Sequence, residues 1–168
     1  MYGRRVRKTD ARVGAYGAVD ELTAALGNAR AAADEPFVRD EILRVQRELI
    51  TVMGELATAE EDLPRYVKDG FQLTGPEMVD RLTGVIDELE SGKVGEIKDW
   101  VIPGETKLAA AVDVARTTCR RAERAVAALT LQNGEILRYL NRLSDLCWLL
   151  ARYAEQLSQA ARGIAENG

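Results

Sequence analysis

A dense group of charged residues lies in the segment Arg116-Thr-Thr-Cys-Arg-Arg-Ala-Glu-Arg124, where four arginines and one glutamate occupy nine positions. At 100° per residue, Arg116, Arg120 and Glu123 share one side of a helix, next to an apolar face. A planar guanidinium group at the edge of a buried stripe suits a polyphosphate or a carboxylate. Two interpretations remain open: a polyanion site, or an exposed row whose arginines pair with acids of a neighbouring helix.

A second polar row lies on the last helical segment, where Asn141 and Asp145 are one turn apart beside an apolar stripe. Antiparallel packing of the two segments would bring both rows together. Asp145 then either forms a structural salt bridge with an arginine or helps to arrange a bound ligand.

The short apolar stretch Trp100-Val-Ile-Pro-Gly104 precedes the arginine segment. Pro103 and Gly104 interrupt any helix there, so we expect an extended strip that leads into the arginine helix. Trp100 has two possible roles: a structural residue that caps the helices, or an aromatic surface that presses on a flat ligand.

The composition excludes several kinds of chemistry. The chain has 168 residues, 46% of them hydrophobic, and 23 basic against 27 acidic residues, which give a net charge of −4. This predicts one domain without the basic field of a nucleic-acid-binding protein. No histidine is present, so a histidine triad or an imidazole-held metal is excluded. Two cysteines at apolar positions indicate reduced core residues and a cytoplasmic protein, and no apolar run is long enough to cross a membrane.

Helical periodicity recurs along the chain, and strand alternation is almost absent, so the predicted class is all-α. We expect a single domain over residues 1–168, with residues 1–18 as an N-terminal arm. A charged connection is expected at 60–74. The expected helices are 19–33, 36–59, 75–91, 108–129 and 135–161.

Three stretches together resemble one family, the PduO-type ATP:cob(I)alamin adenosyltransferases. They are Lys8-Thr-Asp-Ala-Arg-Val-Gly-Ala-Tyr-Gly-Ala-Val-Asp-Glu-Leu22, Trp100–Gly104 followed by Ala115–Arg124, and Tyr139-Leu-Asn-Arg-Leu-Ser-Asp145. Their order and separation also agree, from about Gly3 to Ala154. The resemblance implies an up-down bundle of five helices, with the extended strip before the fourth.

The same resemblance implies transfer of the 5′-deoxyadenosyl group of ATP to the cobalt(I) of a corrinoid, with release of triphosphate. It also implies Mg²⁺, a homotrimer with active sites between subunits, and two further protein partners, a corrinoid reductase and an adenosylcobalamin-dependent enzyme. Because cobalt(I) is itself the nucleophile, no side-chain base is needed, which agrees with the absence of histidine.

Residue by residue, the resemblance implies a nucleotide site around the arginine row. Its ATP ligands would be Lys8, Arg116, Arg120, Glu123, Arg124 and Asn141, with Glu123 also near Mg²⁺. Trp100 stands where many members have phenylalanine below the corrin, and Asp145 resembles the acid at the corrinoid side. Arg116, Arg120 and Asp145 are the expected catalytic residues, and Asp20 is expected to pair with Arg116 across the subunit interface.

Two departures from the family pattern affect these expectations. Members carry a segment like Thr-Gly-Asp-x-Gly-x-Thr before the Lys8 region, and the sequence from Met1 to Lys8 lacks it. Glu105 stands where the family commonly has glycine. The chain is therefore expected either to have a further leader or to be a divergent member. The alternative function is a catalytically impaired relative that acts as a corrinoid-binding or oligomeric scaffold protein.

Overall fold

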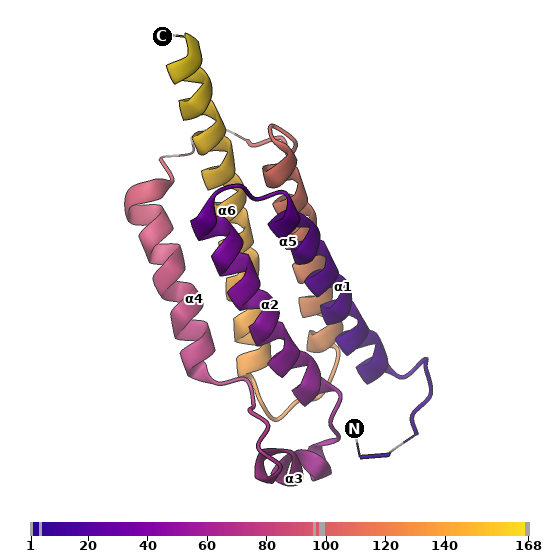
Figure 1. The fold of residues 1–168 in the computed structure, drawn as a ribbon. Coiled ribbons are helices and arrows are strands. Elements are labelled where there is room, and N and C mark those ends of the chain that lie inside the picture. The colour runs from indigo at the N-terminus through magenta and orange to yellow at the C-terminus, as the bar shows by residue number, and fades with distance from the viewer. Residues whose placement is uncertain (1, 4, 96, 98–99, 167–168) are drawn as a thin grey trace.

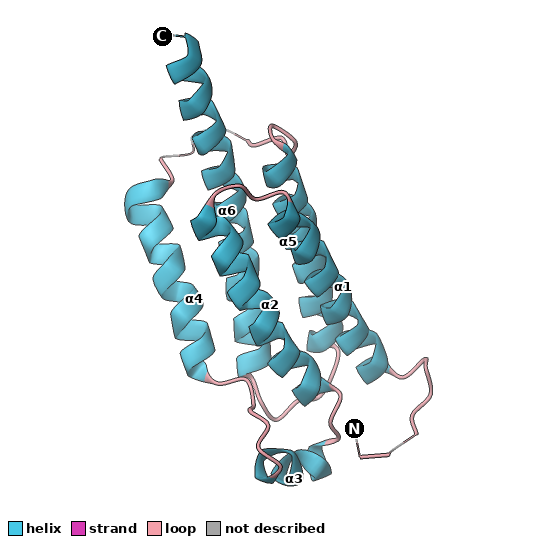
Figure 2. Ribbon diagram, in the orientation of Figure 1, coloured by secondary structure: helices cyan, strands magenta, loops and turns pink. Residues whose placement is uncertain are grey.

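The computed structural model describes all residues except 1, 4, 96, 98, 99, 167 and 168, and for residues 164–166 it describes the backbone alone. All regular structure in this part of the chain is helical, as expected (Figure 2). The elements are α1 (Ala11–Ala31), α2 (Pro36–Leu56), the 3₁₀ turn η1 (Glu60–Asp62), α3 (Leu63–Lys68), α4 (Pro76–Glu88), the π-helical turn η2 (Leu89–Lys93), α5 (Lys107–Ala127) and α6 (Glu135–Glu166).

The long helices lie side by side, and the chain runs up and down between them (Figure 1). Helix α5 packs against both α1 and α6, while α2 packs on α1 and α4 packs on α6. The short helix α3 lies at one end of this bundle, and the last turns of α6 extend beyond the other helices at the opposite end (Figure 1). The pair α5 and α6 therefore carries both polar rows.

Helix α1 begins at Ala11, so the arm expected over residues 1–18 is helical from that residue onward. The side chain of Asp10 caps the helix, because its Oδ1 accepts a hydrogen bond of 2.9 Å from the backbone N–H of Arg12. Gly14 and Gly17 weaken the apolar periodicity of the first two turns, which explains the late predicted start. Residues 1 and 4 of the expected arm lie outside the described residues.

Helix α3 falls within the segment 60–74, which was expected to be only a charged connection. Its six residues are too few to show a helical period, and tertiary contacts hold it. Tyr66 is buried and stacks on Phe71, with ring centroids 4.7 Å apart. The prediction failed because this helix depends on burial that the local sequence does not show.

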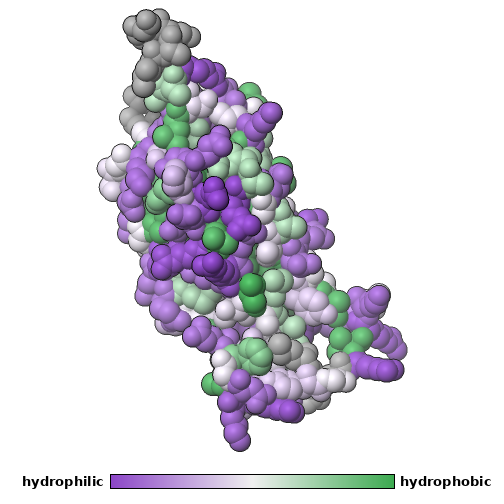
Figure 3. All heavy atoms as spheres, viewed as in Figure 1, coloured by the Kyte–Doolittle hydropathy of each residue, from purple (hydrophilic) through white to green (hydrophobic). Residues whose placement is uncertain are grey.

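Apolar residues of the long helices form one continuous core, which includes Ala15, Leu22, Leu49, Leu82 and Leu143. The face of the molecule seen in Figure 3 is mostly hydrophilic, with small separate apolar patches. No helix among the described residues combines the length and hydropathy of a membrane span.

Candidate functional site

Two side-chain contacts fix the register between α5 and α6. Near one end of α5, Arg152 Nη2 donates to Asp113 Oδ2 over 2.6 Å. About three turns further along, Asn141 Nδ2 donates to Glu123 Oε1 over 3.2 Å. The helices are therefore antiparallel, and the charged row of α5 faces the polar row of α6, as the sequence predicted.

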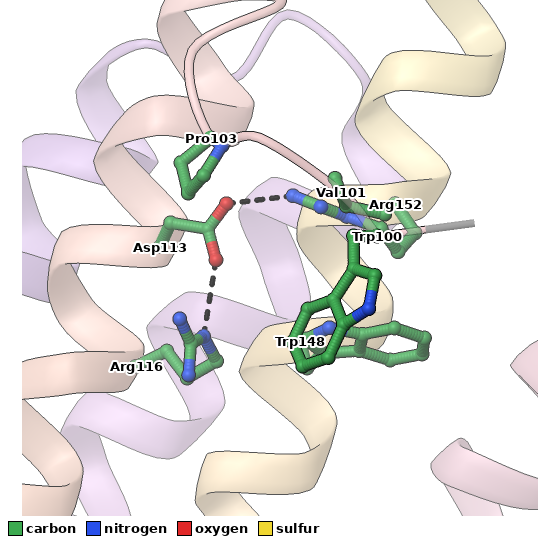
Figure 4. Close-up of a pocket in the computed structure, with 7 residues that line it drawn as sticks. All are labelled: Trp100, Val101, Pro103, Asp113, Arg116, Trp148 and Arg152. Atoms are coloured by element: carbon green, nitrogen blue, oxygen red, sulfur yellow. Dashed lines mark hydrogen bonds and ion pairs between the residues drawn. The ribbon is translucent and has the colours of Figure 1, made fainter. Parts of the chain in front are cut away.

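A pocket of about 490 Å³ opens at the first of these contacts. Its walls come from the loop before α5, from α5 and from α6 (Figure 4). The pocket therefore combines flat aromatic surface with three charged groups. The lining residues are Trp100, Val101, Pro103, Asp113, Arg116, Trp148 and Arg152.

Trp100 does not cap the core, because its side chain is 100% exposed. The structural interpretation of this residue is therefore wrong within the chain. Trp148 of α6 borders the same pocket and is 37% exposed. Large exposed indole surfaces cost free energy in water, so two of them beside one pocket indicate a flat, largely apolar partner. The loop between Val101 and Thr106 has no helix or strand, and Gly104 adopts φ 120°, a conformation that favours glycine.

The arginines of α5 differ in their partners. Arg116 is partly buried, and its Nε donates to Asp113 Oδ1 over 3.0 Å. Arg121 forms an exposed ion pair with Glu21 of α1. The side chains of Arg120 and Arg124 are exposed and make no hydrogen bond or ion pair within the described part of the chain. The interpretation of a row paired with acids of a neighbouring helix thus holds for Arg121, whereas Arg116 pairs with an acid of its own helix. Two guanidinium groups remain available to an anion.

Asp145 does not pair with the arginine row. Its Oδ2 accepts a hydrogen bond of 3.3 Å from Arg142 of its own helix, and both side chains are 46% exposed, so this ion pair contributes little stability. Asp145, Arg120 and Glu123 nevertheless all lie near buried Cys119. Each of the three charges is close enough to shift the pKa of the Cys119 thiol. The register thus brings these three charges to one stretch of the α5–α6 face.

Three further expected site residues lie elsewhere. Lys8 is exposed before α1, and Asp20 is exposed on α1; neither contacts the arginine row within the described chain. Glu105 accepts a hydrogen bond of 2.9 Å from Arg162, near the end of α6. The carboxylate of Glu105, a departure from the family pattern, therefore pairs with α6 and not with the arginine row.

Sequence reasoning missed Asp113, Trp148 and Arg152. Asp113 precedes Arg116 by three residues, a spacing that favours a salt bridge on one helix and was available from the sequence. Arg152 is only 3% exposed, and its contact with Asp113 joins residues 39 positions apart. That contact depends on the helix register, which periodicity alone does not give.

The two cysteines are buried core residues, as expected. Burial raises the pKa of Cys119 well above its ordinary value and raises that of Cys147 from 9.0 to about 12. Both thiols therefore stay protonated and are not nucleophiles of the site.

This gives a prediction for labelling and stability. In the folded protein, iodoacetamide at about pH 8 should label neither thiol, whereas both should react in denaturant. Burial of the neutral Cys147 thiol contributes to the free energy of unfolding, and this contribution is fully present below pH 9.0. It is lost as the pH rises towards about 12, because the thiol of the unfolded chain ionises before that of the folded chain. Mass spectrometry and urea titrations measure the two effects; rapid labelling of the folded chain would contradict the burial.

No group of three or more histidine, cysteine, aspartate or glutamate side chains suited to a metal ion occurs among the described residues. The geometry as a whole is that of a helical-bundle protein with free arginines for an anion on a helix that also borders an aromatic pocket.

Comparison with known proteins agrees with this description. A family model described as cobalamin adenosyltransferase matches residues 1–154. The corrinoid adenosyltransferase of Citrobacter freundii is 39% identical over 157 residues, which cover 91% of this chain and 86% of that protein. A longer relative, corrinoid adenosyltransferase PduO of the same organism, is 36% identical, and the match spans 89% of this chain and 44% of that protein.

A solved structure gives the same result in three dimensions. A variant PduO-type ATP:corrinoid adenosyltransferase from Lactobacillus reuteri, in complex with cobalamin and ATP, superposes with a TM-score of 0.83 and 34% identity. The superposition covers 94% of this chain and 87% of that one. This chain belongs to the cobalamin adenosyltransferase family, of the PduO type.

Proposed function

We propose that this protein is an ATP:corrinoid adenosyltransferase, which transfers the 5′-deoxyadenosyl group of ATP to the cobalt(I) of a corrinoid. In this reaction the cobalt electron pair attacks C5′, the cobalt–carbon bond forms, and the C5′–oxygen bond breaks so that triphosphate leaves with its electrons. The observation that carries the proposal is the pair of unpartnered guanidinium groups, Arg120 and Arg124, on the helix α5 that also supplies one wall of a pocket with two tryptophans. The relative in complex with cobalamin and ATP supports it.

The arginine row would bind the triphosphate part of ATP. Arg120 and Arg124 present donors to the departing charge, and Arg116 joins the row to the pocket. Bound charge of this kind is stabilised most strongly by donors that are already in place. Lys8 would reach the phosphates from the segment before α1, and Asn141, which donates to Glu123, would contact the nucleotide.

Glu123 would hold Mg²⁺ together with phosphate oxygens. Within the described residues, the carboxylate of Glu123 accepts one hydrogen bond, from Asn141 Nδ2 to Oε1, which leaves Oε2 for a cation. Magnesium in nucleotide sites commonly uses one or two carboxylates, with substrate phosphates and water as the remaining ligands. A bound Mg²⁺ would neutralise charge on the triphosphate as it leaves.

The tryptophan pocket would receive the corrinoid. Trp100 is proposed to lie against the lower face of the corrin, where its flat surface excludes an axial ligand from cobalt. Asp145 is proposed to act at the corrinoid side, since it lies on the same α5–α6 face as Arg120. The protein then contributes alignment and charge, and the cobalt supplies the nucleophile. This division of work suits a sequence without histidine.

The assembly is also part of the proposal. The long helices α1, α2, α4, α5 and α6 would form the five-helix bundle of the family in a single domain, and three copies would form a trimer with sites between subunits. Asp20 is exposed on α1 and would pair with Arg116 of a neighbouring copy, whose terminal nitrogens have no partner within the described chain. A cytoplasmic location, a corrinoid reductase and an adenosylcobalamin-dependent acceptor enzyme complete the proposed setting.

The alternative, an impaired relative that serves as a scaffold, is less well supported, because the named relatives are corrinoid adenosyltransferases. A spectroscopic assay separates the two functions. With cob(II)alamin, a strong reductant, ATP and Mg²⁺, the enzyme should convert the cobalt(I) spectrum into that of an alkylcobalamin. Omission of ATP is the control and should leave cobalt(I) unchanged. A flat trace with every component present would contradict the enzyme and favour the scaffold.

A further inference from the structure

One carboxylate at the edge of the pocket serves two arginines. Asp113 accepts a hydrogen bond at Oδ1 from Arg116 Nε over 3.0 Å and another at Oδ2 from Arg152 Nη2 over 2.6 Å. Figure 4 shows the carboxylate between the two guanidinium groups. The side chains of Asp113 and Arg152 are 6% and 4% exposed, whereas that of Arg116 is 25% exposed. The contact thus joins a buried arginine to one that reaches the pocket.

We infer that Asp113 is a positioning residue that holds Arg116 in place for the substrate, an inference that rests on the proposed function. The carboxylate engages only Nε of Arg116, so both terminal nitrogens remain free for phosphate or for a neighbouring subunit. A long arginine side chain loses conformational entropy when it is held in one position. Because Asp113 already orders Arg116 in the free protein, substrate binding does not have to order that side chain.

Asp113 is itself held in place by the buried side chain of Arg152. Arg152 also forms an ion pair of 3.2 Å with Glu155, one turn further along α6. In the described part of the chain Glu155 pairs with Arg152 and not with Arg116, so it cannot replace Asp113 between the two guanidinium groups. Without Asp113, the two guanidinium groups would face each other with little compensation, and Arg116 would be expected to turn away. The position of Arg116 therefore depends on Asp113.

Asp113→Asn is the test, because asparagine keeps the shape and removes the charge. We expect kcat/KM for ATP to fall by on the order of 10- to 100-fold, since displaced binding groups cost rate steeply. In an Arg116→Ala background the same substitution should change kcat/KM by less than about twofold, because the group that it positions is gone. Full additivity of the two substitutions would overturn the inference.

Glu48→Gln is the matched control for stability. Glu48 also binds an arginine from a partly buried site, Arg81 Nε over 2.6 Å, and it does not line the pocket. The substitution Glu48→Gln should lower the midpoint of urea unfolding and leave kcat/KM within about twofold of the unchanged protein. If Asp113→Asn behaved in the same way, its role would be structural only and the inference would be wrong.

Calorimetric titration with Mg²⁺–ATP separates this inference from the proposed function. Turnover of the unchanged protein tests the function alone. If that protein bound Mg²⁺–ATP without turnover, the proposed reaction would be wrong, and the same set of variants would still decide the role of Asp113 from their affinities. We expect weaker binding by Asp113→Asn in the presence of Arg116 and no further loss in its absence. Equal affinities of Asp113→Asn and the unchanged protein would overturn the inference.

Discussion

Arg120→Ala is expected to lower kcat/KM for ATP by about 100- to 1,000-fold, which corresponds to about 3–4 kcal/mol of transition-state stabilisation. The physical reason is that triphosphate gains negative charge as the C5′–oxygen bond breaks. Arg120 is exposed on the α5–α6 face and makes no ion pair within the described chain, so its donors are free for that charge. Steady-state rates from the cobalamin spectrum measure the effect.

The neighbouring residue provides a matched control for this substitution. Arg121 has the same charge and lies on the same helix, but its guanidinium group pairs with Glu21 of α1 and is not free for a substrate anion. Arg121→Ala should therefore leave kcat/KM within about threefold of the unchanged protein, because an exposed ion pair contributes at most about 1 kcal/mol. Equal losses from both substitutions would point to a general charge effect, and unchanged turnover in Arg120→Ala would remove this residue from the site.

Arg81→Ala is expected to reduce the free energy of unfolding by about 3 kcal/mol, because it leaves acids without a countercharge in a partly buried position. Arg81 joins α4 to α2 through Glu41 at 2.8 Å and Glu48 at 2.6 Å, and all three side chains are 14–16% exposed. Tyr139 of α6 donates a hydrogen bond to Glu48 over 2.8 Å. The pKa of Tyr139 is raised well above its ordinary value, mainly by burial and next by the charge of Glu48. One substitution therefore weakens contacts among three helices.

Urea unfolding monitored by circular dichroism measures this loss. The control is Arg138→Ala, since Arg138 is 59% exposed and pairs only with Glu135 of its own helix. Its effect should stay below about 1 kcal/mol. If the two substitutions had similar effects, the network around Arg81 would not be an important source of stability.

The sequence predicted those parts of the fold that follow from local pattern. Helical spacing identified the all-α class and the apolar face of α5, where Ala115, Cys119 and Ala122 are fully buried. The same pattern placed the arginine row beside that face and the row of α6 opposite it, which the Glu123–Asn141 contact confirms. Periodicity works here because each helix is amphipathic and long enough to repeat its pattern several times.

What the sequence did not predict depends on contacts between distant segments. Asp113 and Arg152 lie 39 positions apart in the sequence, and only the register of α5 against α6 brings them together. Trp148 appears in the sequence as one more apolar residue of a core helix, yet it borders the pocket. The start of α1 was missed for another reason: Gly14 and Gly17 carry no side chain that could show which side faces the core.

The chain contains two tryptophans, and both border the same pocket. Since no other indole contributes, the tryptophan emission of the folded protein, excited at wavelengths that tyrosine does not absorb, originates at this one place. A corrin ring absorbs light where indole emits and would receive that energy when it comes close. The molecule thus carries a built-in optical reporter, through which arrival and departure of the coloured substrate can be timed without a label and without turnover.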